Sequence, residues 1–515
     1  MKYLYLFVVL FSVVLLGSCS SDDKTEGHLT ISSDELSFTS EEGVKTFEIT
    51  SNVGWQIIIE GDWCKVNTSN GSNNAVIEVT ALENTKTTVR STQIIVRSVV
   101  GSKSVAITQE AAPEKPKKYI PLMTINTRNK QAITNKTDYI KGDIKIEARN
   151  ENGEKTEVLF EAEMTKDGIR GRGNSTWGME KKPYRLKLDN SVEVLGMPKN
   201  KHWVLLANYS DKTLLRNELA FEISRRMGYA YTPRQKYVDV ILNEDYIGSY
   251  TLCEHVRIDE NRVNISEGKS VSGGYFFEID EREDDIAESV YIHTKGEDLK
   301  GSQKVIICIK TPERPDITPE QVAYVENYFQ TFENVLYGRN SINPVTELEK
   351  HLDLNTFIDN FLVNEMSKNV DGNLRLSTFM YKKEDDDRLY FGPVWDYDIA
   401  FGNVDYDDCF KAEGWHSRGQ KWYKEFFKHP EFEQMVKDRW KELRADKLSN
   451  GSLFAYIDQV AEEIDLSQQE NFRRWYILSR KVWPNYVVTG SYVGEINYLK
   501  EFITNRAAWM DRQLQ

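Results

Sequence analysis

The sequence predicts a multidomain α+β protein, in which a small immunoglobulin-like β-sandwich precedes a larger domain of two lobes. Residues 28–110 contain short alternating apolar stretches separated by Asn, Gly and Ser turns, a pattern typical of a β-sandwich. Residues 111–118 form a linker rich in Pro and Lys. After the linker, strand patterns come first and helix patterns follow, which predicts two lobes with a cleft between them.

The first 18 residues differ from the rest of the chain. Lys2 is followed by roughly a dozen apolar residues, which predicts a secretory signal peptide because the stretch is too short to span a membrane. The ending Leu16 to Cys19 resembles the bacterial lipobox, which implies that Cys19 becomes the acylated first residue of the mature protein. Residues 19–27 are then a tether, and their acidic "SSDDK" resembles the export tag of surface lipoproteins. We therefore expect a lipid-anchored protein of the bacterial cell envelope, in the outer membrane and exposed at the surface.

Composition excludes several classes of function. The 515-residue chain carries a net charge of −14, and an acidic protein lacks the clustered basic surface that general nucleic-acid binding requires. The seven histidines are scattered and form no HExxH motif. The cysteines beyond the lipobox are far apart and form no CxxC pair, so the sequence indicates neither a zinc site nor a disulfide scaffold. These cysteines are Cys64, Cys253, Cys308 and Cys409.

Strand patterns dominate the first half of the large domain. In "VILNEDYIGSYTL" two apolar runs meet at Asn243–Asp245, which predicts a hairpin. "KPYRLKL" is typical of a strand, on which Arg185 and Lys187 share one face. One helix lies among the strands: "TLLRNELAFEISRRMG" has apolar residues at helical spacing and Gly228 as its predicted C-cap.

Helix patterns dominate the second half. Capping residues and prolines indicate where further helices begin: Thr318 to Gln321 (a capping box with Pro at the first helical position), Asp353, Pro430, Ser452 and Ser491. "FMYKKEDDDRLYFGPVWDYD" predicts a hairpin, and we interpret its acidic tip at 384–387 as a solvated turn rather than a metal site. No internal repeat is evident.

Two polar stretches carry candidate chemistry. In 169–187, "IRGRGNSTWGMEKKPYRLK", basic residues gather around two glycines, which fits phosphate binding as well as a solvated turn. In 364–373, "NEMSKNVDGN", a helix ends and leaves Asp371 and Asn373 before the next strand. Asp-Gly-Asn is also an ordinary turn sequence.

A third stretch, 392–403, reads "GPVWDYDIAFGN" and follows the apolar hairpin. As a strand it would place Asp396 and Asp398 on one face and Trp395 and Tyr397 on the other. Carboxylates in an apolar setting need partners, and a divalent cation satisfies two of them at once. A basic element, an Asp/Asn loop and an Asp pair follow one another here in the order in which kinases use such parts.

Long motifs identify the family that the large domain resembles. "RGRGNSTW…KKPYRLKL", "LLRNELAFEISRRMG", "YIGSYTLCEHVRID", "GGYFFEID", "NVDGN" and "GPVWDYDIAFGN" together resemble the CotH family of atypical protein kinases. The resemblance runs from Tyr119 to beyond Phe401, within a domain that we place at 119–515. It implies a fold similar to that of eukaryotic protein kinases. It also implies use of ATP with Mg²⁺ or Mn²⁺, and transfer of the γ-phosphate to Ser or Thr of a protein.

The resemblance also implies roles for individual residues. Asp371 corresponds to the catalytic aspartate, and Asp396, with Asp398, to the metal ligand. The residues expected to contact ATP are Arg172, Lys182, Lys187 and Glu254, with Lys181 as an alternative lysine and Glu278 as an alternative partner for the lysine. The chain departs from ordinary kinases because it has no GxGxxGxV loop and no HRD triplet. Asn373 follows Asp371 by only two residues, which puts its role as a second metal ligand in doubt.

The sandwich resembles a different family. "SNVGWQI", "GDWCKVN" and "VAITQEAA" are similar to BACON-type domains of surface lipoproteins, which are associated with carbohydrate-active systems. Trp55 and Trp63 are candidates for stacking on sugar or for packing in the core, and the domain is equally interpretable as a spacer.

Two other functions stay open for the whole chain. The first is that of a non-catalytic binding or adhesion lipoprotein on a kinase-like scaffold, which would contact a glycan or a partner protein. The second is glycoside hydrolysis, although carboxylates on one strand would lie on one side of a sugar and would not flank it.

The lipobox leads to a direct prediction. Replacing the acylated residue, Cys19→Ser, removes the lipid anchor, whose attachment to the bilayer depends on about 0.8 kcal/mol per buried CH₂ group. We expect the variant in the soluble fraction of the cell envelope, and the native protein in the membrane fraction labelled by an alkyne fatty acid. Equal fatty-acid labelling of both proteins would contradict the lipobox assignment.

Overall fold

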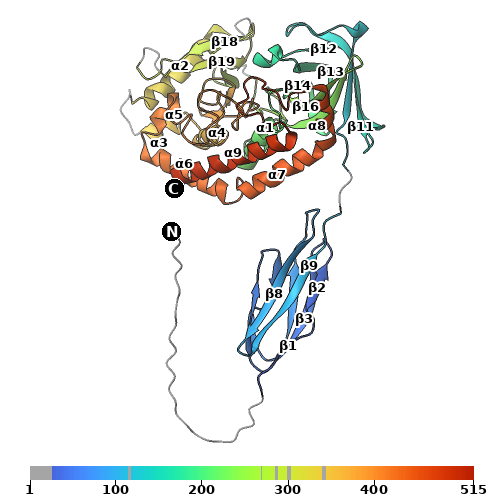
Figure 1. Ribbon diagram of the computed structural model, residues 1–515. Coiled ribbons are helices and arrows are strands. Elements are labelled where there is room, and N and C mark those ends of the chain that lie inside the picture. The colour runs from blue at the N-terminus through green and yellow to red at the C-terminus, as the bar shows by residue number, and fades with distance from the viewer. Residues whose placement is uncertain (1–25, 114–116, 268–269, 285–287, 299–302, 339–343) are drawn as a thin grey trace. The chain divides into compact units, whose positions relative to one another are not determined.

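The structure is a computed structural model that describes residues 26–113, 117–267, 270–284, 288–298, 303–338 and 344–515. The signal peptide and Cys19 lie outside these residues. The chain divides into two compact units, Met1–Pro116 and Lys117–Gln515 (Figure 1). In the described part of the chain, no helix is long and apolar enough to cross a membrane.

The N-terminal unit is a β-sandwich, as predicted. Its two sheets have the strand orders β1-β3-β7-β5 and β2-β9-β8-β4-β6. Alternate side chains of the strands, such as Phe47, Ile77, Val96 and Ile107, point inwards and form one core. The strands are β1 (Leu29–Ile31), β2 (Glu35–Phe38), β3 (Gly43–Ser51), β4 (Gly54–Ile59), β5 (Cys64–Val66), β6 (Asn70–Ser72), β7 (Ala75–Ala81), β8 (Arg90–Ser98) and β9 (Gly101–Gln109).

Both tryptophans of this unit are packed against protein. Trp55 lies in the core, and its indole N–H donates a hydrogen bond to the Asn73 carbonyl over 2.9 Å. Trp63 is half-buried, with the guanidinium of Arg90 4.4 Å from the centre of its ring. The structure therefore favours a packing role for Trp55 over stacking on sugar.

The C-terminal unit begins with a closed barrel of strand order β10-β11-β12-β13-β14-β16-β15. Apolar side chains such as Ile146, Leu186 and Trp203 fill its interior. On β13 the residues alternate in burial, so Arg185 and Lys187 share the outer face, as predicted. The strands are β10 (Leu122–Thr127), β11 (Ile140–Arg149), β12 (Lys155–Gly171), β13 (Tyr184–Val194), β14 (Met197–Leu206), β15 (Gln235–Leu242) and β16 (Asp245–Glu254).

The predicted hairpin at Asn243–Asp245 is confirmed. Strands β15 and β16 pair antiparallel up to Leu242 and Asp245. The two residues between them, Asn243 and Glu244, have φ angles of 50° and 73°, which is the left-handed conformation that a tight hairpin turn requires.

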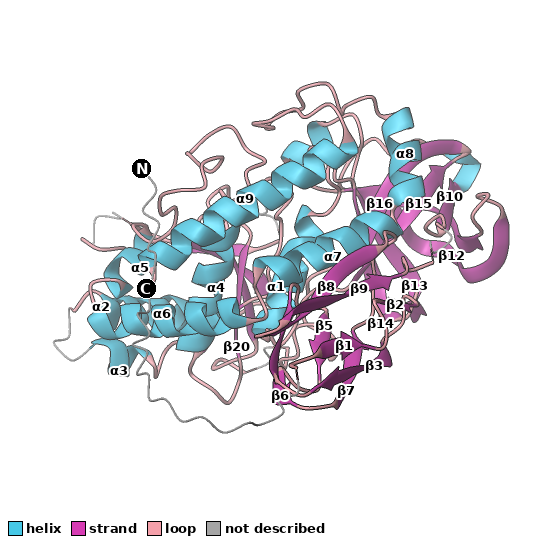
Figure 2. Ribbon diagram, turned by 60° about the horizontal axis from the view of Figure 1, so that its bottom comes forward, coloured by secondary structure: helices cyan, strands magenta, loops and turns pink. Residues whose placement is uncertain are grey.

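A second sheet and a group of helices complete the unit. The sheet has the order β18-β19-β17-β20-β21. In Figure 2 the helices α4, α6 and α9 lie on one side of this unit and the barrel strands on the other, while α8 packs against β16. The strands are β17 (Tyr275–Ile279), β18 (Val290–His293), β19 (Ile306–Thr311), β20 (Thr378–Lys382) and β21 (Leu389–Phe391). The helices are α1 (Arg216–Met227), α2 (Pro319–Leu336), α3 (Pro344–Leu348), α4 (Leu354–Ser367), α5 (Lys421–Phe426), α6 (Pro430–Ala445), α7 (Asn450–Glu463), α8 (Asp465–Arg474) and α9 (Tyr492–Gln513).

Most helix ends lie where their capping residues predicted. Gly228 ends α1 with φ 92°, and Thr318 with Gln321 forms the capping box of α2. Asp353 and Ser491 accept the backbone hydrogen bonds that begin α4 and α9. The prediction for α7 was wrong by three residues. Its N-cap is Ser449, because this hydroxyl accepts from the Ser452 backbone N–H.

The prediction of a strand at 392–403 is wrong. Strand β21 ends at Phe391, and the chain then runs as a loop in which Asp396 has φ 68°. Pro393 has no N–H to donate to a neighbouring strand. The N–H of Tyr397 is satisfied by the side-chain oxygen of Asn217, 2.8 Å away on α1, instead of by a strand. We call residues 392–404 the aspartate loop.

A buried ion pair joins the last described helix to the middle of the unit. Arg506 of α9 donates to Glu365 of α4 over 2.6 Å, and both side chains are fully buried. The Glu365 carboxylate also accepts from the backbone N–H groups of His416, Ser417 and Arg418. One carboxylate thus holds a helix and a loop in place.

Because a buried charge without its partner is costly, Arg506→Met should lower the free energy of unfolding of the C-terminal unit by about 3–5 kcal/mol. Denaturant unfolding followed by far-UV circular dichroism measures this change. The matched control is Arg473→Met, which removes the exposed pair with Glu470 and should change the free energy by less than about 1 kcal/mol. Equal effects of the two substitutions would contradict this role for Arg506.

Candidate functional site

Asp371 lies in a loop that begins where α4 ends. Lys368 ends the helix in a left-handed conformation, with φ 44°. A Cβ atom on Gly372 would lie 1.9 Å from Oδ1 of Asn364, so only glycine fits at this position. The carboxylate of Asp371 is buried and accepts a hydrogen bond of 3.2 Å from Arg375. We call residues 368–377 the Asp371 loop.

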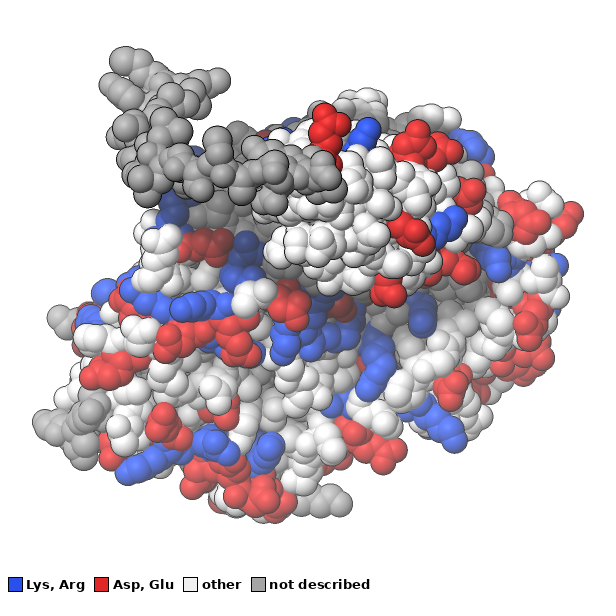
Figure 3. Space-filling view, turned by 90° about the horizontal axis from the view of Figure 1, so that it is seen from below, with Lys and Arg blue, Asp and Glu red and all other residues white. Residues whose placement is uncertain are grey.

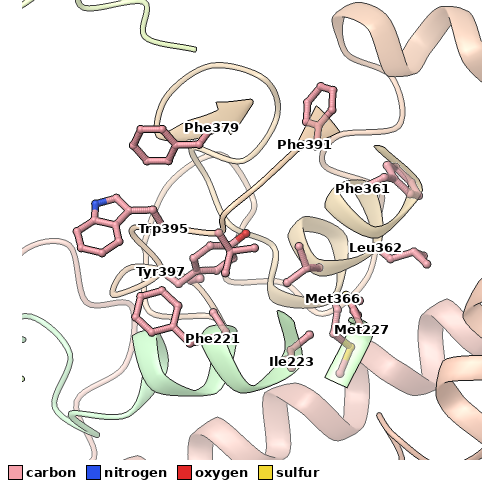
Figure 4. Packing of buried hydrophobic residues seen from close by; sticks show 14 of the residues in the cluster. Phe221, Ile223, Met227, Phe361, Leu362, Met366, Phe379, Phe391, Trp395 and Tyr397 are labelled. Carbon is pink, nitrogen blue, oxygen red and sulfur yellow. The ribbon is translucent and has the colours of Figure 1, made fainter. Parts of the chain in front are cut away.

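Two aromatic side chains fix the aspartate loop. The ring of Trp395 stacks on Phe221 of α1, with 6.1 Å between the ring centres. The hydroxyl of Tyr397 donates to Oδ1 of Asn364 on α4 over 2.9 Å. Figure 4 shows Trp395 and Tyr397 beside Phe221 of α1, with α4 on the other side of Tyr397. Trp395 and Tyr397 therefore hold the loop by packing and hydrogen bonding against α1 and α4, although the backbone that carries them is not a strand.

The packed loop brings the carboxylates of Asp396 and Asp398 close to that of Asp371. Asp398 is buried, and burial first, then the charges of Asp396, Asp211 and Asp371, raise its pKa to about 8. Burial and the charge of Asp396 raise the pKa of Asp371 to about 6. The hydroxyl of Ser377 donates to Asp396 over 3.4 Å. The three carboxylates repel one another, so the site favours a bound cation.

Arg172 connects the barrel to these carboxylates. It follows β12 directly, and its guanidinium lies 5.7 Å from the centre of the Trp395 ring. Burial lowers the pKa of Arg172, whereas the charges of Asp396, Asp398 and Glu278 act to raise it. The first and third of the polar stretches in the sequence therefore meet in space.

A basic face extends from Arg172 along the outside of the barrel. In the strand register Arg170 lies opposite Arg185, and Lys187 lies opposite His202. The rings of His202 and His255 are 6.3 Å apart. We define the basic face as Arg170, Arg172, Arg185, Lys187, His202, His255 and Arg257.

Several nitrogens of the basic face have no partner. Nε of Arg170, Nε of Arg185, and Nδ1 of His202 and of His255 are buried without a hydrogen bond. Burial and the charges of Arg257, Arg185 and Lys187 lower the pKa of His202 to about 3. Over most of the face shown in Figure 3, basic and acidic side chains are interspersed, whereas the basic face gathers four arginines and a lysine beside unpaired nitrogens. Such a group fits an anion with several oxygens.

Family comparisons agree with this geometry. A model described as CotH kinase protein matches residues 169–510, well over half of the chain. The chain belongs to the CotH family. A second model, that of the BACON N-terminal binding domain, matches residues 46–110. No curated protein matches the chain.

Two similar solved structures each match about a fifth of the chain. A Bacteroides ovatus GH5 xyloglucanase in complex with a XXXG heptasaccharide is 14% identical, over 21% of this chain and 22% of that one, with a TM-score of 0.16. A Bacteroides thetaiotaomicron protein solved by NMR is 18% identical, over 19% of this chain and 98% of that one, with a TM-score of 0.14. The chain therefore spans less than a quarter of the xyloglucanase, and scores this low carry no information about the whole fold.

Within this CotH domain the lysines named from the sequence bind groups other than Asp371, Asp396 and Asp398. Lys187 pairs with Asp167 over 3.1 Å, although it belongs to the basic face. Lys182 donates to the Trp177 carbonyl over 2.7 Å. The alternative, Lys181, is buried and donates to Asn471 over 2.9 Å and to a backbone carbonyl.

The two candidate glutamates have different neighbours. Glu254 is buried and pairs with Arg234 over 3.0 Å and with Arg262 over 3.7 Å. Glu278 lies near Lys310, and burial raises its pKa to about 7, with Asp396 among the contributing charges. Glu278 is therefore the glutamate that shares the site of the aspartates.

Sequence reasoning missed Arg185, His202 and His255 as members of one surface. The alternation of "KPYRLKL" placed Arg185 on the right face, but two isolated histidines carried no signal until the barrel register paired their strands. Asp211 was also missed. It is buried, pairs with Arg216 over 2.6 Å, and Arg216 donates in turn to the Ala400 carbonyl of the aspartate loop.

The donor set fits a divalent cation such as Mg²⁺. Among the residues that the structure describes, no three His, Cys, Asp or Glu side chains form a preformed metal cage. Mg²⁺ commonly takes only one or two carboxylates and completes its shell with water and phosphate oxygens. Asp396 and Asp398 supply such carboxylates, and Oδ1 of Asn373 is a buried oxygen without a hydrogen-bond partner.

The raised pKa of Asp398 predicts the direction in which the stability of the protein changes with pH. Because the pKa in the folded protein lies above the ordinary value, folding takes up a proton, and this contribution to stability is lost as the pH rises from about 4 through about 8. At pH 8.5 without metal, Asp398→Asn should therefore melt at a higher temperature than the native protein.

Metal binding should reverse this order. With Mn²⁺ at 100 times its dissociation constant, the free energy of unfolding of the native protein should rise by about 2.7 kcal/mol and that of the variant much less. Thermal melting with and without Mn²⁺ measures both effects, and a native protein that Mn²⁺ does not stabilise would contradict the site.

Proposed function

We propose that this protein is a metal-dependent protein kinase of the cell envelope, which transfers the γ-phosphate of ATP to Ser or Thr of a protein. The observation that carries the proposal is the meeting of two groups of opposite charge. Arg172, at one end of the basic face, lies over the ring of Trp395 in the aspartate loop and is acted on by the charges of Asp396 and Asp398, as Asp371 is by that of Asp396. Membership of the CotH kinase family supports the same chemistry.

The basic face is the proposed site of the triphosphate. Neighbouring residues on one face of a strand are roughly 7 Å apart, so Arg172 and Arg170 can both contact one triphosphate, and the row of Lys187 and His202 lies next along the barrel. Unpaired nitrogens of Arg170 and Arg185 supply donors that reach phosphate oxygens. Asp396 and Asp398, with Asn373, would hold Mg²⁺ or Mn²⁺, which offsets the charge that develops on the transferred phosphoryl group.

Asp371 is the proposed base. Its pKa of about 6 leaves the carboxylate mainly ionised at neutral pH, yet close enough to that pH to accept a proton efficiently. Arg375 orients the carboxylate through the hydrogen bond of 3.2 Å. In this arrangement Asp371 accepts the proton of the acceptor hydroxyl as the oxygen attacks phosphorus, and the ADP oxygen leaves in line on the other side.

The proposed location follows from the N-terminal features. Acylation of Cys19 would tether the kinase to the outer membrane with its domains at the surface. The BACON domain, matched as a binding domain, would supply a second contact, with a glycan or a partner protein.

Replacement of the base separates catalysis from binding. Asp371→Asn should lower the rate of transfer by about 10²–10⁴, the usual contribution of a general base, and leave Mg²⁺-ATP binding intact. Asp396→Asn should lose both transfer and metal-dependent ATP binding. Phosphate transfer from labelled ATP, to casein or to the protein itself, and isothermal titration calorimetry measure the two quantities.

A matched control is Asp385→Asn, an exposed carboxylate in the acidic turn of the β20–β21 hairpin, which should change neither quantity. Full activity of both Asp371→Asn and Asp396→Asn would overturn the assignment. A folded native protein that binds no ATP with metal would instead favour a non-catalytic binding protein on this scaffold.

The basic face is tested separately. Arg185→Gln removes one guanidinium whose Nε has no protein partner, so it should raise the KM for ATP roughly tenfold or more and change kcat less, since a hydrogen bond to a charged group contributes about 1.5–3 kcal/mol. Lys141→Gln, an exposed lysine on β11 of the same barrel, is the control. An unchanged KM in Arg185→Gln would exclude the basic face as the triphosphate site.

A further inference from the structure

Exposed apolar side chains of the C-terminal unit concentrate in the segment between α8 and α9. Tyr476 is 74% exposed, Trp483 57% and Tyr486 49%; Val488 is also exposed, as is Val493 in the first turn of α9. Exposed aromatic side chains that gather in one segment, unlike those scattered singly, often mark an interaction surface. The segment is therefore a candidate interaction surface.

Two of these rings are held rigidly by a second segment. Trp483 stacks on Tyr406 with 6.3 Å between ring centres and 10° between planes, and Tyr486 stacks on Phe410 at 4.2 Å and 20°. We call these four residues the aromatic surface. The ammonium of Lys368 fixes the segment of Tyr406 and Phe410, because it donates to the carbonyls of Asp408 and Glu413 over 3.0 and 2.7 Å.

The aromatic surface adjoins the proposed base. Arg375 lies 3.2 Å from the carboxylate of Asp371 and 4.0 Å from that of Asp407, the neighbour of Tyr406. The charge of Asp371 is one of the causes that raise the pKa of Tyr406 to about 12, after burial. Arg375 therefore links the segment of Tyr406 to Asp371, and the aromatic surface is within electrostatic range of the proposed base.

Charges around the aromatic surface are paired. Asp405 binds Lys481 over 2.6 Å, and Asp408 binds Lys411 over 2.9 Å. Asp407 faces Arg375. An aromatic centre with a balanced polar rim is the composition of protein–protein interfaces, and it favours neither an acidic nor a basic partner.

We propose that the aromatic surface docks the acceptor protein, and that it selects a segment in which bulky apolar side chains flank the Ser or Thr. This inference rests on the proposed kinase function and adds the class of acceptor. Rigid stacked rings bind apolar side chains with little loss of conformational entropy, which suits an extended acceptor segment.

The test uses the full-length protein and three synthetic Ser peptides, whose flanking residues are Leu and Phe, Lys, or Glu. Fluorescence anisotropy of labelled peptides measures binding without ATP, and transfer from labelled ATP measures kcat/KM. We expect the apolar peptide to bind at least roughly tenfold more tightly than the other two. Trp483→Ala and Tyr486→Ala should each weaken its binding about tenfold or more, the loss typical of a central interface residue, and leave ATP affinity unchanged.

The matched control is Tyr476→Ala. Tyr476 is exposed on the same segment but stacks on no ring among the described residues, so it lies outside the aromatic surface. This variant should bind the apolar peptide as tightly as the native protein does.

Several outcomes would overturn the proposal. One is tighter binding of a charged peptide than of the apolar one. Another is unchanged binding of the apolar peptide in both Trp483→Ala and Tyr486→Ala. A third is that no peptide binds, whereas cellohexaose binds to the native protein and not to these variants. A dimer that Trp483→Ala converts to monomers in analytical ultracentrifugation would assign the surface to a second copy of the chain instead. Because peptide binding is measured without ATP, docking of the apolar peptide without any phosphate transfer would support the surface and contradict the kinase function. Transfer without a preference among the peptides would do the reverse.

Discussion

The site depends on one side chain, Asn364, which stands between the two loops that carry the aspartates. Its oxygen accepts the hydroxyl of Tyr397 from the aspartate loop and leaves space only for glycine at position 372 of the Asp371 loop. Its amide nitrogen donates to the Asn360 carbonyl one turn earlier on α4, over 2.8 Å. Since α4 is buried, this contact sets the separation of Asp371 from Asp396 and Asp398. The repulsion among the carboxylates is maintained because the loops are not free to move apart.

Much of the fold follows from local sequence signals. Helix caps such as Thr318 and Gly228, and the tight turn at Asn243, act through the nearest few residues, so the sequence alone places them. The aspartate loop shows where this reasoning stops. Alternation of Trp395, Asp396, Tyr397 and Asp398 is typical of a strand. The backbone N–H of Tyr397 instead donates its hydrogen bond to the side chain of Asn217, which is far away in the chain.

The residues of the candidate site likewise divide into those that local motifs identified and those that depend on distant parts of the chain. Asp371, Asp396 and Asp398 were named from motifs and lie together, and Arg172 joins them. The lysines and Glu254 were named from the analogy with ordinary kinases, in which a lysine and a glutamate pair. Here Glu254 is paired with arginines, and the cation near Asp396 and Asp398 is Arg172, at the end of a basic face whose rows lie on neighbouring barrel strands. Strand register is a property of the whole barrel, so no single stretch of sequence contains it.

The pair of Glu365 and Arg506 has a consequence for when the protein becomes competent. Glu365 is the neighbour of Asn364 on α4, and its partner lies 141 positions later in the chain, on α9. A ribosome that has reached the aspartate loop has not yet supplied Arg506, so the helix that sets the aspartates still lacks its partner. The site is thus completed only after α9 has been synthesised.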